Sequence, residues 1–220
     1  MTATARGPAN VPGPRPRARR GEGSKLRELI LDAAERLLVR YGDADAVSIR
    51  GIAEAVGVTP PSIYLHFTDK EALIRAVSER SFAEFDDAVE GAGAGVSDPL
   101  EALRARAHAY VRFGLENPEQ YRVLFMSKTG THGPEVDFAA MPGSDAFQHV
   151  VDAVGRAIDS GALRGDVDPF LTATGLWACV HGVTSLMISL PEFPWPDVDA
   201  LVDHICGSQL SGLVAKEKTR

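Results

Sequence analysis

The sequence predicts an all-α protein of about nine helices, with a small three-helix head at the N-terminus and a larger helical body after it. Apolar residues recur at helical spacing from residue 24 onward, and no convincing segment alternates apolar and polar residues as a half-buried strand does. Capping residues mark most of the expected helix starts, and prolines and glycines mark the boundaries. A chain of 220 residues, 45% of them hydrophobic, is long enough to bury a sizeable core.

The first two helices are expected between residues 24 and 57. Ser24 is expected to cap the first helix and Gly42 to end it. Its apolar face would hold Leu26, Leu29, Ile30, Ala33, Leu37, Leu38 and Tyr41. Ser48 is expected to cap the short second helix. Gly57 would break that helix, because glycine adopts the left-handed turn conformation at little cost.

The third and fourth helices follow directly. Thr59 is expected to cap the third helix, with Pro60 and Pro61 in a first turn whose amide hydrogens would be unsatisfied anyway. Thr68 and Glu71 have the spacing of a capping box, which predicts a longer fourth helix beginning near Asp69.

The body is expected to contain five further helices. The glycine-rich stretch 90–96 predicts a flexible break between the fourth helix and the body. Asp98-Pro99, Asn117-Pro118, Asp168-Pro169 and Pro196-Asp197 mark the starts of the fifth, sixth, eighth and ninth helices. A loop is expected over residues 128–143, a seventh helix ending at Gly161, and an end of the ninth helix near Val214.

The segment from Phe170 to Leu190 carries no formal charge and is long enough to be tested as a membrane span. Its hydroxyl-bearing residues and its acidic flanks, Asp168 and Glu192, argue against a membrane anchor. We therefore expect no membrane association and a helix buried on nearly all sides.

Charge is distributed unevenly along the chain. The net charge is −7, yet residues 1–27 hold seven basic residues against Glu22 alone, and the acidic excess follows residue 76. Residues 1–23 are rich in Arg, Pro and Gly, which predicts a disordered basic arm. The alternative is a passive solvated leader.

Residues 48–67 read SIRGIAEAVGVTPPSIYLHF, the pattern of a helix, a glycine turn and a second helix. Ile52, Val58, Ile63 and Phe67 would form a small core, which leaves several polar side chains facing outward on the second helix. This layout is typical of a helix-turn-helix whose second helix enters the major groove. An ordinary helical hairpin is the alternative.

The segment from Lys25 to Ala76 resembles the DNA-binding head of the TetR family of bacterial regulators. The resemblance rests on ILDAAERLLVRYG, SIRGIAEAVGV, SIYLHF and TDKEALI. In the body, WACVHGV (177–183) and ENPEQYRVLF (116–125) are similar to a Trp-His-Gly group of TetR C-terminal domains. The resemblance implies a DNA-binding head over residues 24–75, an effector-binding and dimerisation domain over 76–220, and a homodimer acting on double-stranded operator DNA. Repression is the common mode among such proteins.

The resemblance also implies DNA contacts by position. The candidates are Ser48, Arg50, Thr59, Pro60, Ser62, Tyr64, His66 and Lys70. Tyr64 and Lys70 are expected at phosphates, which fix register, and Thr59, Ser62 and His66 at base edges. The Pro60-Pro61 pair departs from the small or basic residues that relatives often carry. An ion pair with Glu54 is the alternative role for Arg50.

The body concentrates aromatic and soft side chains that are candidates for a small-molecule pocket. They are Tyr110, Phe113, Tyr121, Phe125, Met126, Phe147, Trp177 and His181. An apolar cavity with His181 as a polar anchor would take an apolar or amphipathic effector that releases the operator. A packed core, with His181 hydrogen-bonded inside it, is the alternative.

Small residues on the uncharged helix predict where two subunits meet. Gly175, Cys179, Gly182 and Ser189 lie near one side of it, and the ninth helix adds Val198, Leu201, Val202 and Ile205. We expect these two helices to pair with their symmetry mates in a four-helix arrangement.

No motif predicts an enzyme, a cofactor or a metal site. The two cysteines, Cys179 and Cys206, suit a reducing cytoplasm, and Asp145, His149 and Asp152 share a helix face that is expected to be solvated. Two other functions stay open: a regulator without an effector, and an enzyme or sequestering protein that binds small molecules and uses its head for protein contacts.

Overall fold

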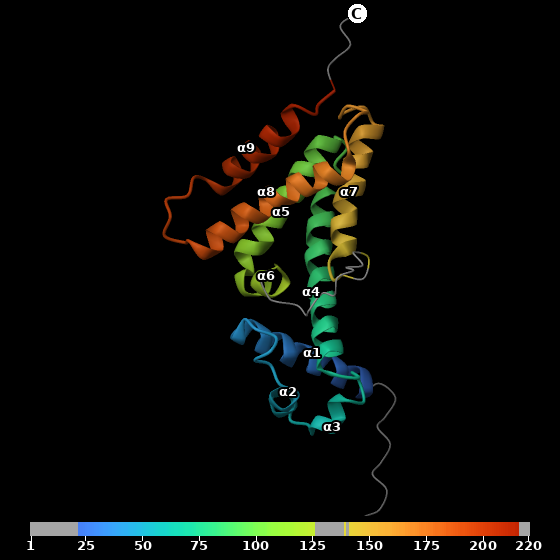
Figure 1. Cartoon of the computed structure of the whole chain (residues 1–220), viewed down its shortest axis with the longest axis vertical. Coiled ribbons are helices and arrows are strands. Elements are labelled where there is room, and N and C mark those ends of the chain that lie inside the picture. The colour runs from blue at the N-terminus through green and yellow to red at the C-terminus, as the bar shows by residue number, and fades with distance from the viewer. Residues whose placement is uncertain (1–21, 126–138, 140, 216–220) are drawn as a thin grey trace, which may run out of the picture.

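The computed structural model describes residues 22–125, 139 and 141–215. Within these residues the chain forms nine helices and no strand, which confirms the all-α prediction. They are α1 (Glu22–Tyr41), α2 (Ile49–Val56), α3 (Pro60–Ile63), α4 (Lys70–Gly93), α5 (Pro99–Glu116), α6 (Pro118–Phe125), α7 (Ser144–Asp159), α8 (Pro169–Ser189) and α9 (Val198–Ser211). Figure 1 shows α1 to α3 gathered at one end, the body at the other, and α4 running from one to the other.

The head folds as its local sequence predicts, with two corrections at helix starts. Gly57 ends α2 with a φ of 78°, and the hydroxyl of Ser48 accepts a hydrogen bond from the amide of Gly51. α1 begins at Glu22, so Ser24 lies inside the helix and not at its cap. The residue that caps α4 is Asp69, whose carboxylate accepts from the amide of Ala72 at 2.6 Å, and not Thr68.

The head has its own hydrophobic core, in which α1, α2, α3 and the start of α4 meet. Ile30, Ile52 and Ile63 are completely buried there, and Leu73 and Val77 of α4 complete it. Val123 of α6 is buried in the same cluster, although it belongs to the body by sequence. The head and body are therefore joined by shared packing as well as by the continuous α4.

The predicted flexible break at residues 90–96 is wrong, because α4 continues through Gly93. A side chain at Gly93 would collide with the guanidinium of Arg106 on α5, so the glycine permits a close approach of the two helices. Arg106 in turn forms an ion pair with Glu90 of α4 at 2.6 Å. Gly93 thus allows α4 and α5 to pack.

The body surrounds α5 with α4, α6, α7, α8 and α9. Asp98, Asp168 and Asp197 cap α5, α8 and α9, as their sequence pattern predicts. The expectation that α8 is buried on nearly all sides is wrong, because Leu171 and Leu186 are 71% and 50% exposed. Length and composition alone would let α8 cross a membrane, but it packs against α5, α7 and α9 within the helical body.

A candidate DNA-binding head and a cavity in the body

The polar side chains of the predicted recognition segment lie at the outer end of the head. α3 is a single turn, and Tyr64, 53% exposed, follows it directly. Ile63 and Phe67 are buried on the other side of the segment and attach it to α1 and α2. Thr59, Pro60 and Tyr64 are exposed, and Ser62 and His66 are half-buried. The head thus presents the predicted residues on an accessible segment that a packed core supports.

Four of the predicted DNA-binding residues, Ser48, Thr59, Ser62 and Lys70, already make side-chain hydrogen bonds within the head. Thr59 is the N-cap residue of α3, as predicted, but its hydroxyl lies 3.1 Å from that of Ser62 and makes no capping hydrogen bond. The ammonium of Lys70 donates to the carbonyl of Asp45 at 3.3 Å, which holds the lysine beside the start of α2. Arg50 is exposed, and within the described residues it forms no ion pair with Glu54. Its charge is therefore available to a partner.

A cavity of about 510 Å³ lies inside the body, within the range of roughly 300–1,000 Å³ typical of small-molecule sites. Five of the predicted ligand residues line it: Tyr110, Phe125, Phe147, Trp177 and His181. Phe113 and Tyr121 do not line it, and Tyr121 is completely buried in the body core. Met126 lies outside the described residues.

Most of the remaining lining residues are apolar, and sequence reasoning missed them. Phe82, Phe85 and Val89 come from α4, and Ala146 and Val150 come from α7. Phe82 and Phe85 each make edge-to-face contact with Phe125 across the helices. The helical spacing of the α4 residues was a usable signal, but the sequence did not reveal which residues of α7 face them.

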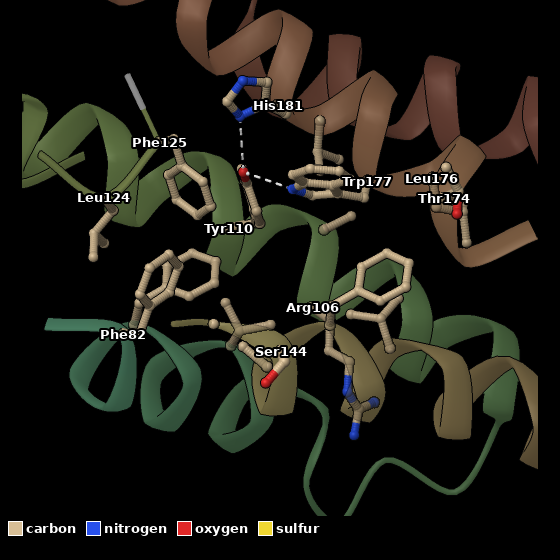
Figure 2. A pocket seen from close by; sticks show the side chains of 18 of the residues that line it. Phe82, Arg106, Tyr110, Leu124, Phe125, Ser144, Thr174, Leu176, Trp177 and His181 are labelled. Atoms are coloured by element: carbon tan, nitrogen blue, oxygen red, sulfur yellow. Dashed lines mark hydrogen bonds between the residues drawn. The ribbon is translucent and has the colours of Figure 1, made fainter. Parts of the chain in front are cut away.

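Five side chains form a hydrogen-bonded cluster beside the cavity. Tyr110, Trp177 and His181 line the cavity and are shown in Figure 2, whereas Tyr121 and Ser185 do not line it. The hydroxyl of Ser185 lies 3.3 Å from Nε2 of His181. The indole of Trp177 donates to the hydroxyl of Tyr110 at 3.2 Å. The Tyr110 hydroxyl lies 3.2 Å from Nδ1 of His181 and 3.1 Å from the Tyr121 hydroxyl, which itself lies 2.7 Å from the same Nδ1. His181 is thus both hydrogen-bonded in the body and part of the cavity wall.

Burial keeps this cluster uncharged. It lowers the pKa of His181 below its usual value and raises the pKa of Tyr110 and of Tyr121. Each shift favours the neutral form of its side chain near neutral pH. The cluster therefore presents hydrogen-bonding groups to the cavity without presenting a charge.

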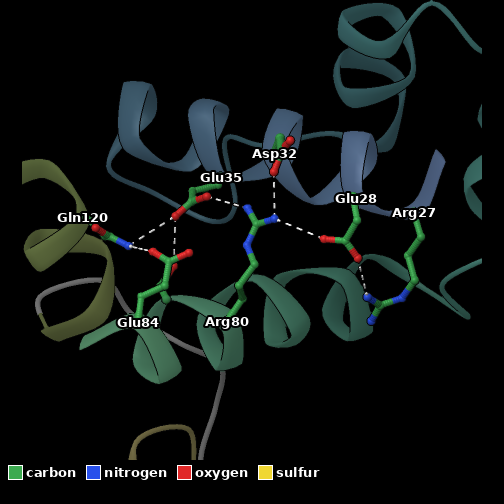
Figure 3. A network of polar contacts seen from close by, with 8 residues as sticks. Arg27, Glu28, Asp32, Glu35, Arg80, Glu84 and Gln120 are labelled. Carbon is green, nitrogen blue, oxygen red and sulfur yellow. Dashed lines mark hydrogen bonds and ion pairs between the residues drawn. The ribbon is translucent and has the colours of Figure 1, made fainter. Parts of the chain in front are cut away.

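A second polar network joins the head to the body. Figure 3 shows Arg80 of α4 between the carboxylates of α1. Arg80 pairs with Asp32 at 2.7 Å and with Glu35 at 2.5 Å, and these hydrogen bonds raise the pKa of its guanidinium although burial lowers it. Gln120 of α6 donates to Glu84 at 3.0 Å and to Glu35 at 3.5 Å. The network connects α1, α4 and α6 where head and body meet.

The predicted dimer residues separate into two groups. Val202 is completely buried within the protomer, and Val198 and Ile205 pack against the same core. Gly175 and Cys179 face Gln209 of α9 in the same protomer. These residues therefore serve the protomer itself.

The other group lies on the accessible side of α8. A Cβ atom added at Gly182 would meet nothing within 4 Å. Ala178, Leu186 and Ser189 are exposed beside it. This side of α8, together with the exposed Ala200, His204 and Ser208 of α9, is a surface that a second subunit can cover.

Two histidines outside the cavity, His108 and His149, pair with carboxylates. His149 of α7 contacts Asp86 of α4 at 2.9 Å, and His108 lies between Asp199 and Asp203 of α9. In the part of the chain that the structure describes, no group of three or more His, Cys, Asp or Glu side chains is arranged to hold a metal ion.

Two known protein-family models match this chain, one over the head and one over the body. Residues 30–77 match the family model described as "Bacterial regulatory proteins, tetR family". Residues 103–208 match the model described as "Tetracyclin repressor-like, C-terminal domain". The finer placement in the Trp-His-Gly group stays a prediction.

Individual relatives and structures agree with these matches. The chain is 35% identical to the transcriptional regulator UidR of Escherichia coli K12 over 74% of its own length and 81% of that protein. It is 30% identical to the transcriptional activator FasR of Mycolicibacterium smegmatis, over 73% and 72% of the two chains. A solved structure of a protein of unknown function from Rhodococcus sp. RHA1 superposes with a TM-score of 0.72 at 27% identity, covering 86% of this chain and 95% of that one. The chain belongs to the TetR family and is a transcriptional regulator with a helix-turn-helix head and a helical C-terminal domain.

Proposed function

We propose that this regulator represses transcription from a palindromic operator as a homodimer and is released when a small apolar or amphipathic molecule enters the cavity in its body. The observation that carries the proposal is the double role of α4. Leu73 and Val77 of α4 belong to the head core, whereas Ser78, Phe82 and Phe85 line the cavity. A molecule in the cavity therefore contacts the same rigid helix that holds the recognition segment.

α6 supports the same coupling from the other side. Val123 is buried in the head core, and its neighbours Leu124 and Phe125 line the cavity. A ligand weakens DNA binding only if it prefers the arrangement of the two heads that does not fit the operator. A coupling of about 1–3 kcal/mol through α4 and α6 would change operator affinity roughly 5- to 150-fold.

The proposed DNA contacts are made by exposed and half-buried polar residues of the head. Lys70 and Tyr64 would contact phosphates, since Lys70 lies in the first turn of α4, where backbone amides also favour an anion. Thr59, Ser62 and His66 would face base edges, and Ser48, Arg50 and Pro60 would complete the contact surface. Two heads in a symmetric dimer read half-sites about one helical turn, roughly 34 Å, or somewhat more apart.

The test begins with selection of bound fragments from a random DNA pool, followed by footprinting of the selected site. The proposal expects a two-fold symmetric site, a dimer on it, and lower expression of a reporter placed behind it. Lys70→Ala should weaken binding to all sequences alike. An asymmetric site occupied by one subunit, or a reporter that the protein activates, would contradict the dimer or the repression.

The effector part has a separate test. Compounds that raise the melting temperature of the protein are added to the complex with DNA, and release is measured in the wild type and in Trp177→Ala. Loss of release in a variant that still folds and binds DNA supports the cavity as the site. A regulator without an effector is the outcome if no lipophilic compound shifts the melting temperature. The place of action we propose is the cytoplasm, where the chromosome of a bacterial cell lies.

A further inference from the structure

We infer that the cavity binds uncharged amphipathic molecules, an apolar body carrying a hydroxyl or carbonyl group, and selects against amphipathic ions of either sign. This inference rests on the proposed effector site and narrows the chemistry of its ligand. The charges, the hydrogen bonds and the apolar surface of the described lining residues support it.

A cation finds no counter-charge among the described residues of the cavity wall. Among the described residues that line the cavity there is no aspartate or glutamate. The groups that carry a positive charge there are Arg104 and Arg106. An ammonium ion in the cavity would therefore lose its hydration without gaining a counter-charge, which is the unfavourable case for a buried ion.

An anion finds both arginines already engaged. The guanidinium of Arg106 donates to the two carboxylate oxygens of Glu90 at 2.6 and 3.0 Å and to the carbonyl of Ala102 at 3.0 Å. This pairing also lowers the pKa of Glu90, so the carboxylate that neutralises Arg106 stays ionised. Arg104 pairs with Glu101 at 2.8 Å and lies 3.5 Å from Asp203, although its Nε makes no hydrogen bond within the described residues. A carboxylate ligand would therefore meet arginines whose positive charge is already neutralised by carboxylates of the protein.

An uncharged polar group of a ligand can form hydrogen bonds with the cavity wall. Tyr110, Trp177 and His181 line the cavity and belong to the neutral cluster. A hydroxyl oxygen accepts two hydrogen bonds and donates one, and a neutral imidazole donates from one nitrogen and accepts at the other. These atoms already bond one another, so a ligand carbonyl or hydroxyl would replace one internal hydrogen bond, which rotation of a hydroxyl group allows without moving a charge. The rest of the ligand would pack against the phenylalanine and aliphatic side chains of α4 and α7.

Three compounds with the same alkyl chain test the inference: decanol, decanoate and decylammonium, all at neutral pH. Trp177 is one of two tryptophans in the chain, so its fluorescence in a Trp195→Phe background reports on the cavity alone. We expect decanol to bind with a dissociation constant at least about tenfold lower than that of either ion. Equal or tighter binding of decanoate or decylammonium would overturn the inference.

A carboxylate placed in the wall separates charge matching from general hydrophobicity. Thr174 lines the cavity and is half-buried, so Thr174→Asp supplies the counter-charge that an ammonium lacks. This variant should bind decylammonium at least about tenfold more tightly than the parent does. Ala88→Asp adds the same charge on an exposed position of α4 and is the control that leaves the preference unchanged.

The outcomes distinguish this inference from the function on which it rests. If Thr174→Asp does not fold, the three compounds on the parent protein decide the question by themselves. An unchanged preference in a folded Thr174→Asp variant counts against charge matching. If none of the three compounds binds, the inference fails, and operator selection, which needs no ligand, still decides whether the protein represses as a dimer.

Discussion

The hydroxyl of Tyr110 is the centre of the cavity-wall cluster, and Tyr110→Phe removes it while keeping the ring. The change deletes one partner each from Trp177, Tyr121 and His181. Tyr121 and His181 remain 2.7 Å apart and satisfy each other. The indole of Trp177 is left without its acceptor, although Trp177 is 38% exposed and water can replace part of the loss.

The expected cost follows from these partners. A net hydrogen bond contributes about 0.5–1.5 kcal/mol, and a buried donor left unpaired costs about 1–3 kcal/mol. Because Trp177 is partly solvated, we expect Tyr110→Phe to lower the free energy of unfolding by about 1–2 kcal/mol. For a chain of this size that corresponds to a fall in melting temperature of about 2–8 °C.

Urea unfolding at fixed protein concentration measures this loss, with an unchanged dependence on urea as evidence that the folded state is the same. Tyr41→Phe is the control, because Tyr41 is 49% exposed and should lose almost nothing. Operator affinity without effector should stay near that of the wild type. A Tyr110→Phe variant as stable as Tyr41→Phe would refute the cluster as a stabilising unit. A loss well above about 3 kcal/mol would show that the hydroxyl organises more of the body than its partners indicate.

Three further predictions concern the head, the subunit contact and the effect of pH. Lys70→Ala should make the plot of log affinity against log salt concentration less steep, by about 0.9 for each phosphate that the protein no longer neutralises. Binding titrations at several salt concentrations measure this slope. An unchanged slope would exclude Lys70 from the phosphate contacts. Gly182→Leu should leave the protomer folded, because a Cβ atom added at this position meets nothing within 4 Å, but it should shift sedimentation toward the monomer. Sedimentation as a normal dimer of wild-type stability would count against α8 as the contact. The hydrogen bond that His149 donates to the carboxylate of Asp86 raises the pKa of His149 above its ordinary value of 6.5. The contribution of this pair to stability is therefore present below pH 6.5 and is lost as the pH rises through the raised pKa. His149→Gln should therefore destabilise the protein more near pH 5.5 than near pH 8.5. The difference between the two losses of unfolding free energy should be only about 0.5 kcal/mol, because the His149 side chain is 46% exposed. Equal losses at both pH values would contradict the pairing of His149 with Asp86.

The sequence determined the features that depend on neighbouring residues. Ser48 at the start of α2 and Gly57 at its end specify the helix-turn-helix through local hydrogen bonds and backbone conformation. The Asp-Pro pairs mark the starts of α5 and α8 for the same reason, since a carboxylate accepts from amides two or three residues away. Five of the eight residues predicted for the pocket line it, because large aromatic side chains in a helical body are concentrated in its interior.

Only the tertiary structure decided the contacts between residues far apart in the chain. The glycines near residue 93 suggest a break, yet α4 continues through Gly93, where the missing side chain leaves room for the guanidinium of Arg106 on α5. Tyr121 is buried behind the cavity and Phe82 lines it, although both are aromatic residues on helices. The uncharged α8 is predicted to be buried but keeps one accessible side, because its neighbours in the protomer cover only part of its circumference. Helical periodicity identifies which residues share a face, and only the packing of the other helices determines what that face contacts.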